Sequence, residues 1–274
     1  MSLPLAAFSP QFRRVRFVLV EPTLAANIGA AARALKTMGF TRLVVVNPRD
    51  RAYRSDPDAI ALATGAADVL AASESHDDLL GALAGVQLAI ALSGYDREFG
   101  PPLRDLHSAA VDAARQLAEI ASGDLAFVFG TERSGLSNAD VLSCQWCAAI
   151  PADPKFASLN LAQSVQVAAY ECQLALRGSS AIHAGQLRFE GGEPPAGVAA
   201  LEKLYAHFEE AATAVGFHDP AEPKTLMVRV RRLFNRAQPT QTEVDLLRGV
   251  LAAVIQSRAD RAGRKRGGAD RGDT

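Results

Sequence analysis

The chain has 274 residues, with 29 Lys and Arg residues against 30 Asp and Glu residues, which leaves a formal net charge of −1. This length is typical of one or two domains, and the even charge balance excludes a surface that is basic throughout. No apolar run reaches the roughly 20 residues of a membrane helix, and the N-terminus lacks the pattern of a signal peptide. Three cysteines are too few for a disulfide scaffold, so we expect a cytoplasmic protein with reduced thiols and no membrane contact.

Strand and helix patterns alternate over the first 177 residues. Short β-branched and apolar runs predict buried strands at residues 15–21, 42–47, 67–70, 86–93, 124–130 and 146–150. Amphipathic or alanine-rich stretches predict helices at residues 27–39, 56–63, 76–83, 106–121, 139–144 and from 161 onward. This order predicts an α/β fold with a mostly parallel sheet, about five or six strands wide and flanked by helices.

The first predicted helix carries two polar residues of interest. Asn27 is a good N-cap, and Gly39 is placed to end the helix in a left-handed turn. On a helical wheel the apolar side chains between Ile28 and Met38 share one face, while Arg33 lies nearly opposite. Arg33 is therefore not a core residue, and it is either a solvated surface arginine or a group that meets a ligand.

The composition of the sequence changes after residue 177. Residues 178–197 are rich in Gly, Ser and Pro, which is typical of a linker, and three helical patterns follow at residues 199–215, 223–235 and 241–258. We therefore predict one domain over residues 1–177, a linker at 178–197, a helical domain at 198–258 and a disordered basic tail at 259–274.

A basic segment lies within the second of these C-terminal helices. Residues 223–242 contain no acidic side chain and five basic ones, namely Lys224, Arg229, Arg231, Arg232 and Arg236. Such a segment is either a solvated helix face that aids solubility or a contact for the phosphate backbone of a nucleic acid.

Several familiar catalytic signatures are absent from the sequence. It has no phosphate-binding loop of the type G-x-x-x-x-G-K-[ST], no G-x-G-x-x-G after the first strand, and no H-E-x-x-H. The five histidines are scattered among unrelated segments, which indicates that the chain holds no metal site. Cys144 and Cys147 form a single C-x-x-C, which we interpret as two small buried apolar residues.

Three polar junctions remain, each where a predicted strand passes into a loop or helix. They are Asn27 with Arg33, the loop GTERSGL at residues 130–136, and the stretch from Ser158 to Asn160. Ligands of parallel α/β sheets bind at the carboxyl ends of the strands, where such junctions meet. Taken singly each junction also fits an ordinary helix cap or a tight turn.

In chain order the three junctions resemble the three motifs of a known family. The segments NIGAAARALKTMGF, FVFGTERSGL and IPADPKFASLNLAQSVQVAAYE are similar to those of the SpoU–TrmH (SPOUT) RNA 2′-O-ribose methyltransferases. The C-terminal VRRLFNRAQPTQTEVDLLRGVL resembles the helical extension of the TrmJ group, which methylates cytidine or uridine at nucleotide 32, the first of the tRNA anticodon loop. The resemblance implies a sheet with a deep C-terminal trefoil knot, S-adenosyl-L-methionine as cofactor with S-adenosylhomocysteine as product, a tRNA substrate and a homodimer.

The resemblance also implies which residues carry the site. The cofactor would lie against Leu92, Ser93, Gly94, Gly130, Ile150, Ala157, Ser158 and Leu159. The catalytic surroundings would be Asn27, Arg33, Glu132, Ser158 and Asn160. The loop at residues 94–102 has the pattern of neither a helix nor a strand and contains Asp96, Arg97 and Glu98, so we expect it to border the RNA entrance.

Roles follow from the chemistry of methyl transfer to a ribose hydroxyl. Because arginine stays protonated in proteins, we expect Arg33 to clamp phosphate and stabilise the developing alkoxide, not to act as a base. Ser158 and Asn160 would orient the hydroxyl and the cofactor, and Glu132 would hold a neighbouring loop or a cation in place. The same motifs also fit methylation of ribosomal RNA, a catalytically silent RNA-binding homologue, or an unrelated α/β enzyme with similar loops.

Overall fold

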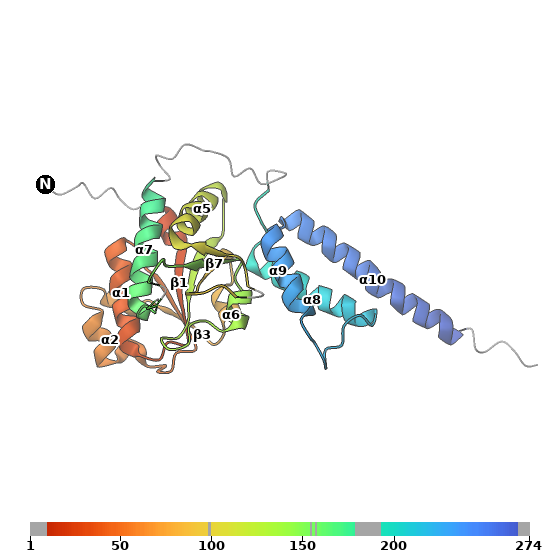
Figure 1. The fold of residues 1–274 in the computed structure, drawn as a ribbon, viewed down its shortest axis with the longest axis horizontal. Helices are drawn as coiled ribbons and strands as arrows, with labels where there is room; N and C mark the ends of the chain where they lie inside the picture. Colours follow the sequence, from red (N-terminus) through yellow and green to blue (C-terminus); the bar gives the residue numbers. More distant parts are fainter. Residues whose placement is uncertain (1–9, 98–99, 154, 157, 179–192, 268–274) are drawn as a thin grey trace, which may run out of the picture.

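The computed structural model describes residues 10–97, 100–153, 155–156, 158–178 and 193–267, with side chains up to residue 256. Two parts follow each other along the chain: a sheet flanked by helices, and a set of three helices at the C-terminal end (Figure 1). Most of the predicted linker lies outside the described residues, whereas residues 259–267 of the predicted tail continue the last helix and residues 268–274 lie outside.

The described residues form one seven-stranded sheet with the strand order β3-β2-β1-β6-β4-β7-β5. Every strand pair in it is parallel, so all the carboxyl ends meet at one edge. The strands are β1 (Val15–Val20), β2 (Arg42–Val46), β3 (Glu74–His76), β4 (Val86–Leu92), β5 (Leu103–Asp105), β6 (Asp124–Phe129) and β7 (Trp146–Ala149). The predicted α/β class and parallel sheet are confirmed, and the two strands beyond the predicted core are three-residue strands at the two edges of the sheet.

Helices cover both faces of the sheet. They are α1 (Ala25–Met38), α2 (Pro57–Leu62), α3 (Ala67–Ala71), α4 (Leu79–Ala82), α5 (Leu106–Glu119), α6 (Asn138–Leu142) and α7 (Leu161–Gly178), with short 3-10 turns at Pro10–Arg14 and Tyr53–Ser55. Successive residues of β1 point to opposite faces, so Phe17 belongs to the core under α1, α5 and α7, while Val18 belongs to the core under α4 and α6. This arrangement of helices on the two faces leaves the carboxyl edge of the sheet free to carry a site.

Two local predictions are wrong. Residues 67–70 are not a strand but part of helix α3, whose Val69 and Leu70 are buried, and the strand follows it as β3. A stretch of only four residues, Ala-Asp-Val-Leu, fits either structure, and here it packs against α1 as a helical turn. Asn27 is not the N-cap of α1, which begins two residues earlier after Leu24, a residue with no capping side chain. Gly39 does end that helix in a left-handed conformation, with φ of 86°.

The C-terminal helices form a small core of their own and also contact the sheet. They are α8 (Val198–Ala214), α9 (Leu226–Ala237) and α10 (Gln241–Gly267). Val198 of α8 packs into the sheet core beside α4 and α6, whereas α10 extends away from the sheet (Figure 1). The side chain of Asn235 donates a 3.0 Å hydrogen bond to the carbonyl of Cys144, which fixes α9 against the turn before β7. None of the helices in the described part of the chain is long and apolar enough to cross a membrane.

Candidate active site

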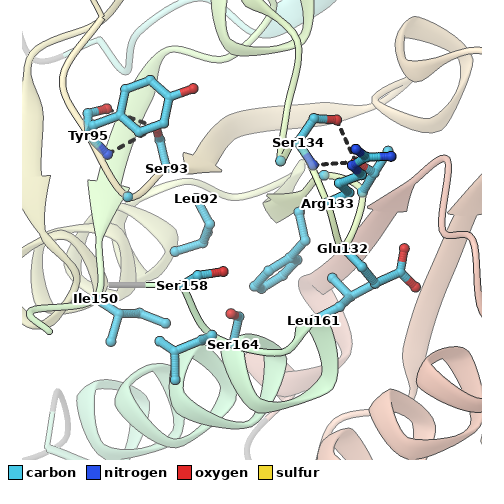
Figure 2. A pocket seen from close by; sticks show the side chains of 16 residues that line it. Leu92, Ser93, Tyr95, Glu132, Arg133, Ser134, Ile150, Ser158, Leu161 and Ser164 are labelled. Carbon is cyan, nitrogen blue, oxygen red and sulfur yellow. Dashed lines mark hydrogen bonds between the residues drawn. The ribbon is translucent and has the colours of Figure 1, made fainter. Parts of the chain in front are cut away.

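A pocket of about 280 Å³ lies at the carboxyl edge of the sheet, where β4, β6 and β7 end (Figure 2). The predicted cofactor residues meet there: its lining includes Leu92, Ser93, Gly94, Gly130, Ile150, Ser158 and Leu159. The predicted Ala157 lies outside the described residues. Segments that are more than 60 residues apart in sequence thus share one cavity, because parallel strands deliver them to the same edge. Their cofactor role stays a prediction.

The loop after β6 is the tightest part of the pocket wall. Thr131 and Gly135 exchange two backbone hydrogen bonds of 3.2 and 3.0 Å, and Gly135 takes a positive φ of 68°. A side chain on Gly130 would place its Cβ only 2.0 Å from the backbone carbon of Gly135. The loop therefore folds back on Gly130 so closely that only glycine fits there.

Glu132, at the tip of this loop, ties it to the start of α1. Its carboxylate accepts hydrogen bonds from the Thr23 amide (2.9 Å) and hydroxyl (2.6 Å), the Leu24 amide (3.1 Å) and the Asn27 side-chain amide (2.9 Å). An anion at this place also complements the positive end of the helix, which its own N-cap residue does not. Partial burial raises the pKa of Glu132, but the hydrogen bonds from Thr23 and Asn27 outweigh it and bring that pKa from 4.5 to about 2.

Asn27 and Asn160 continue the connection to the third motif. The Asn160 side-chain amide donates a 3.0 Å hydrogen bond to Asn27 Oδ1, and its own oxygen accepts from the amides of Ala162 (2.9 Å) and Gln163 (3.3 Å), which caps α7. Glu132, Asn27 and Asn160 therefore form one continuous hydrogen-bonded relay between the starts of α1 and α7. We call these three residues the Glu132 relay. Asn27, only 7% exposed, is its centre.

Ser158 and Arg33 are not part of the Glu132 relay. Ser158 is exposed and lines the pocket, with Ser164 of α7 near it (Figure 2). Arg33 is exposed on α1, as the helical wheel predicts, but it does not line the pocket. Its guanidinium makes no hydrogen bond or ion pair within the residues that the structure describes. The structure thus brings four of the predicted catalytic residues together at the carboxyl edge, and leaves Arg33 outside the cavity of its own chain.

Two further residues take part in the site without any motif that marks them. Thr23 gives Glu132 two of its hydrogen bonds, and its only sequence signal is its place directly after the first strand. Tyr95 lines the pocket and is 57% exposed, with Arg97 stacked over its ring at 4.6 Å. Arg97 joins the loop after β4 to the loop after β6, because it donates to the Leu136 carbonyl at 2.8 Å and to the Asn138 side chain.

The cysteines are buried, as predicted, and free. Burial raises the pKa of the Cys147 thiol to about 11 and that of Cys144 well above its ordinary value, so neither is a ready thiolate. Across the described ranges, no group of three or more His, Cys, Asp or Glu residues is arranged to hold a metal ion.

Comparison with known proteins agrees with this geometry. The sequence model of the SpoU rRNA Methylase family matches residues 14–170, and that of the tRNA methyltransferase TrmJ C-terminal domain matches residues 199–265. The chain belongs to the SpoU methylase family. It is 40% identical to the tRNA (cytidine/uridine-2'-O-)-methyltransferase TrmJ of Escherichia coli (strain K12), over 89% of this chain and 96% of that protein. The predicted resemblance is therefore confirmed, and the chain is a methyltransferase.

Solved structures agree with both parts of the chain. TrmJ from Z. mobilis ZM4 is 31% identical, with a TM-score of 0.72 over 87% of this chain and 98% of that one. A probable methyltransferase from Bordetella pertussis Tohama I is 48% identical, with a TM-score of 0.58 over 61% of this chain and 98% of that one. The first match extends beyond the sheet into the C-terminal helices, whereas the second covers a shorter part of the chain.

Proposed function

We propose that the chain transfers a methyl group from S-adenosyl-L-methionine to the ribose 2′-hydroxyl of cytidine or uridine in tRNA, at nucleotide 32 of the anticodon loop. The observation that carries the proposal is the Glu132 relay, which joins all three family motifs beside one pocket. The similarity to TrmJ over 89% of the chain supports tRNA as the class of substrate.

The pocket suits the cofactor by size and by chemistry. Its volume of about 280 Å³ is close to the lower end of small-molecule sites, roughly 300 Å³. Small residues such as Gly94 and Gly130 let the backbone approach a ligand, while the hydroxyls of Ser158 and Ser164 have no partner among the described residues. When bound, the cofactor supplies an electrophilic methyl group on a sulfonium centre, and S-adenosylhomocysteine is the product. We assign Leu92, Ser93, Gly94, Gly130, Ile150, Ala157, Ser158 and Leu159 to hold it.

The chain's own residues would position the hydroxyl and stabilise its charge. Ser158 and Asn160 lie two residues apart directly before α7, where they can orient the ribose. The protonated guanidinium of Arg33 clamps a phosphate and stabilises the alkoxide that forms as the hydroxyl loses its proton. Because Arg33 lies outside the cavity of its own chain, we propose that it acts in a homodimer at the pocket of the partner subunit. The cytoplasmic location and the trefoil knot implied by the family belong to the same proposal.

The C-terminal helices would contribute a second contact to the tRNA. Arg229 and Arg232 are exposed on α9, whereas Arg231 pairs with Glu202 of α8 and so helps to hold the helices together. We propose that residues 198–258 bind the tRNA backbone through this face, as a domain separate from residues 1–177. Binding should then weaken steeply with salt, by a slope that falls when Arg229 and Arg232 are replaced.

The full-length protein, incubated with S-adenosylmethionine and unmodified tRNA transcripts, tests the activity. Nucleoside mass spectrometry should find 2′-O-methylcytidine or 2′-O-methyluridine at nucleotide 32. If the protein methylates ribosomal RNA but not tRNA, its substrate is ribosomal RNA and the proposal is wrong. If calorimetry shows that it binds RNA but not the cofactor, it is a catalytically silent homologue.

Replacement of Arg33 by Lys tests its assigned role. Loss of one preorganised donor lowers the rate by about 10²–10³-fold, and a lysine cannot match a two-pronged contact. The matched control is Arg51→Lys. Arg51 is an exposed arginine in the loop after β2, and it pairs with Asp77, which follows β3. Near-full activity of Arg33→Lys would argue against a geometrically strict role.

A further inference from the structure

An exposed aromatic ring stands at the rim of the pocket. Tyr95, three residues after the end of β4, is 57% exposed although it lines the cavity. Its backbone carbonyl accepts a 2.8 Å hydrogen bond from the Ser93 hydroxyl, which fixes the turn that presents it. Figure 2 shows the ring at the side of the pocket opposite Ser134. An aromatic side chain offers a flat apolar face, so a ring held in place beside a pocket can contact a ligand bound there.

One face of this ring is already backed by a fixed cation. The guanidinium carbon of Arg97 lies 4.6 Å from the ring centroid. Arg97 is itself anchored, through hydrogen bonds to the Leu136 carbonyl in the loop after β6 and to the Asn138 side chain at the start of α6. The cation and its anchors order the ring before any ligand arrives, which reduces the conformational entropy lost on binding. With Arg97 over one face, a flat ligand would stack on the other.

The chemistry of the substrate indicates what that ligand is. In a ribonucleotide the base is joined to C1′, directly beside the C2′ that bears the acceptor hydroxyl. When the hydroxyl reaches into the pocket, the base of the same nucleotide must therefore lie at the rim. Proteins that read single-stranded RNA loops hold such unstacked bases on aromatic side chains.

We infer that Tyr95, backed by Arg97, is a stacking platform for the base of the nucleotide that is methylated. This inference rests on the proposed function and assigns the platform to that function. Every base has a π-face, so stacking alone does not separate cytidine from uridine, and the platform would accept both equally. Selection between them, where it occurs, must come from groups that contact the base edge.

The test compares variants that differ in the π-face alone. Tyr95→Phe keeps the ring and should lose much less activity on tRNA than a variant without a ring. Tyr95→Leu keeps apolar bulk without a ring, and its kcat/KM should fall by about 10- to 100-fold, equally for transcripts with cytidine or uridine at the target. Arg97→Leu, which removes the backing cation, should give a smaller loss.

Two binding measurements separate the platform from other roles. Calorimetry with S-adenosylhomocysteine should give the same affinity for Tyr95→Leu as for wild type; an equally large loss there would place the ring against the cofactor and overturn the inference. Pyrrolocytidine at the target position of the tRNA should be quenched on binding to wild type and Tyr95→Phe but not to Tyr95→Leu.

The platform and the proposed function fail in different ways. If wild type methylates tRNA and Tyr95→Leu does so equally well, the platform is wrong and the function stands. If wild type methylates no tRNA, the proposed function is wrong and the platform falls with it.

Discussion

Two polar junctions hold distant segments of this chain together, one at the carboxyl edge of the sheet and one beneath the C-terminal helices. The first is centred on Glu132, a half-buried anion that accepts four hydrogen bonds from the start of α1. The second is centred on Asn235, a neutral side chain 4% exposed between the Tyr205 hydroxyl and the Cys144 carbonyl. The pocket is thus fixed by a charge, and the helical extension by a neutral amide.

The two junctions should respond differently to pH and to the loss of a hydrogen-bonding partner. Hydrogen bonds to a carboxylate are stronger than neutral ones, but they depend on pH and are weakened by solvent. A buried neutral amide is insensitive to pH, and breaking its contacts leaves desolvated partners unpaired. Acid should therefore destabilise the carboxyl edge of the sheet, whereas the C-terminal helices should be destabilised by the loss of a buried hydrogen-bonding partner at any pH.

We expect the greatest loss from Gly130→Ala, which places a side chain against the loop after β6. The new Cβ would lie 2.0 Å from the backbone carbon of Gly135 and 2.1 Å from the amide nitrogen of Leu136, so the loop must open. We expect a loss of about 3 kcal/mol or more in the free energy of unfolding and at least 100-fold in methylation. Urea unfolding and a methylation assay measure both.

Gly94→Ala is the matched control in the same pocket wall. A Cβ there meets no atom within 4 Å, so its unfolding free energy should stay within about 0.5 kcal/mol of wild type. Equal stability of the two variants would show that the loop after β6 is not as closely folded as described.

The next effect comes from breaking the neutral junction with Asn235→Ala. The Cys144 carbonyl and the Tyr205 hydroxyl would both lose a partner in a buried place, which should lower the unfolding free energy by about 2–3 kcal/mol. Tyr205→Phe removes only one of the two contacts and should lower it by about 1 kcal/mol. Urea unfolding at pH 7 and again at pH 5 should give the same differences, since neither group titrates in that range. A pH-dependent difference would contradict a neutral junction.

A smaller effect, and one that depends on pH, is expected for Glu132→Gln. Hydrogen bonds to a charged group contribute about 1.5–3 kcal/mol, and partial exposure reduces this to about 1–2 kcal/mol for Glu132. Its pKa is 4.5 ordinarily and about 2 in the folded chain, so in that interval the unfolded chain binds more protons. The stabilisation is therefore complete above pH 4.5 and is lost as the pH falls towards 2.

Urea unfolding of wild type and Glu132→Gln at pH 6 and pH 3 measures this. The gap between the two proteins should be full at pH 6 and smaller at pH 3. An unchanged gap would mean that the hydrogen bonds of Glu132 do not depend on its charge.

The elements that sequence alone predicts well are those that a single pattern determines. The central strands are buried on both faces and read as continuous apolar runs, so β1, β2, β4 and β6 were predictable. The edge strands β3 and β5 have three residues each and are paired on one side only, which leaves no pattern to detect.

The site divides in the same way. The family motifs predicted the residues that meet in the pocket, but Asn27 was expected to cap its own helix by local rules. The structure shows that it joins Glu132 to Asn160 across more than 100 residues of chain, a contact that no local preference encodes. Thr23 could not be singled out, because its role depends on where another loop lies; for Tyr95 the sequence predicted only that its loop, residues 94–102, borders the RNA entrance.

The weakest effect is expected for a second glycine-to-alanine change, which lies in α10 of the C-terminal helices. Gly249 is exposed in the interior of this helix, and a Cβ there meets nothing within 4 Å. Alanine restricts the unfolded chain and favours the helix, so Gly249→Ala should raise the stability of the C-terminal helices by about 0.5–1 kcal/mol. Amide hydrogen exchange along α10 measures this directly, with slower exchange expected near the substitution. Faster exchange near the substitution would contradict this expectation, since nothing within the described chain crowds a side chain at that position.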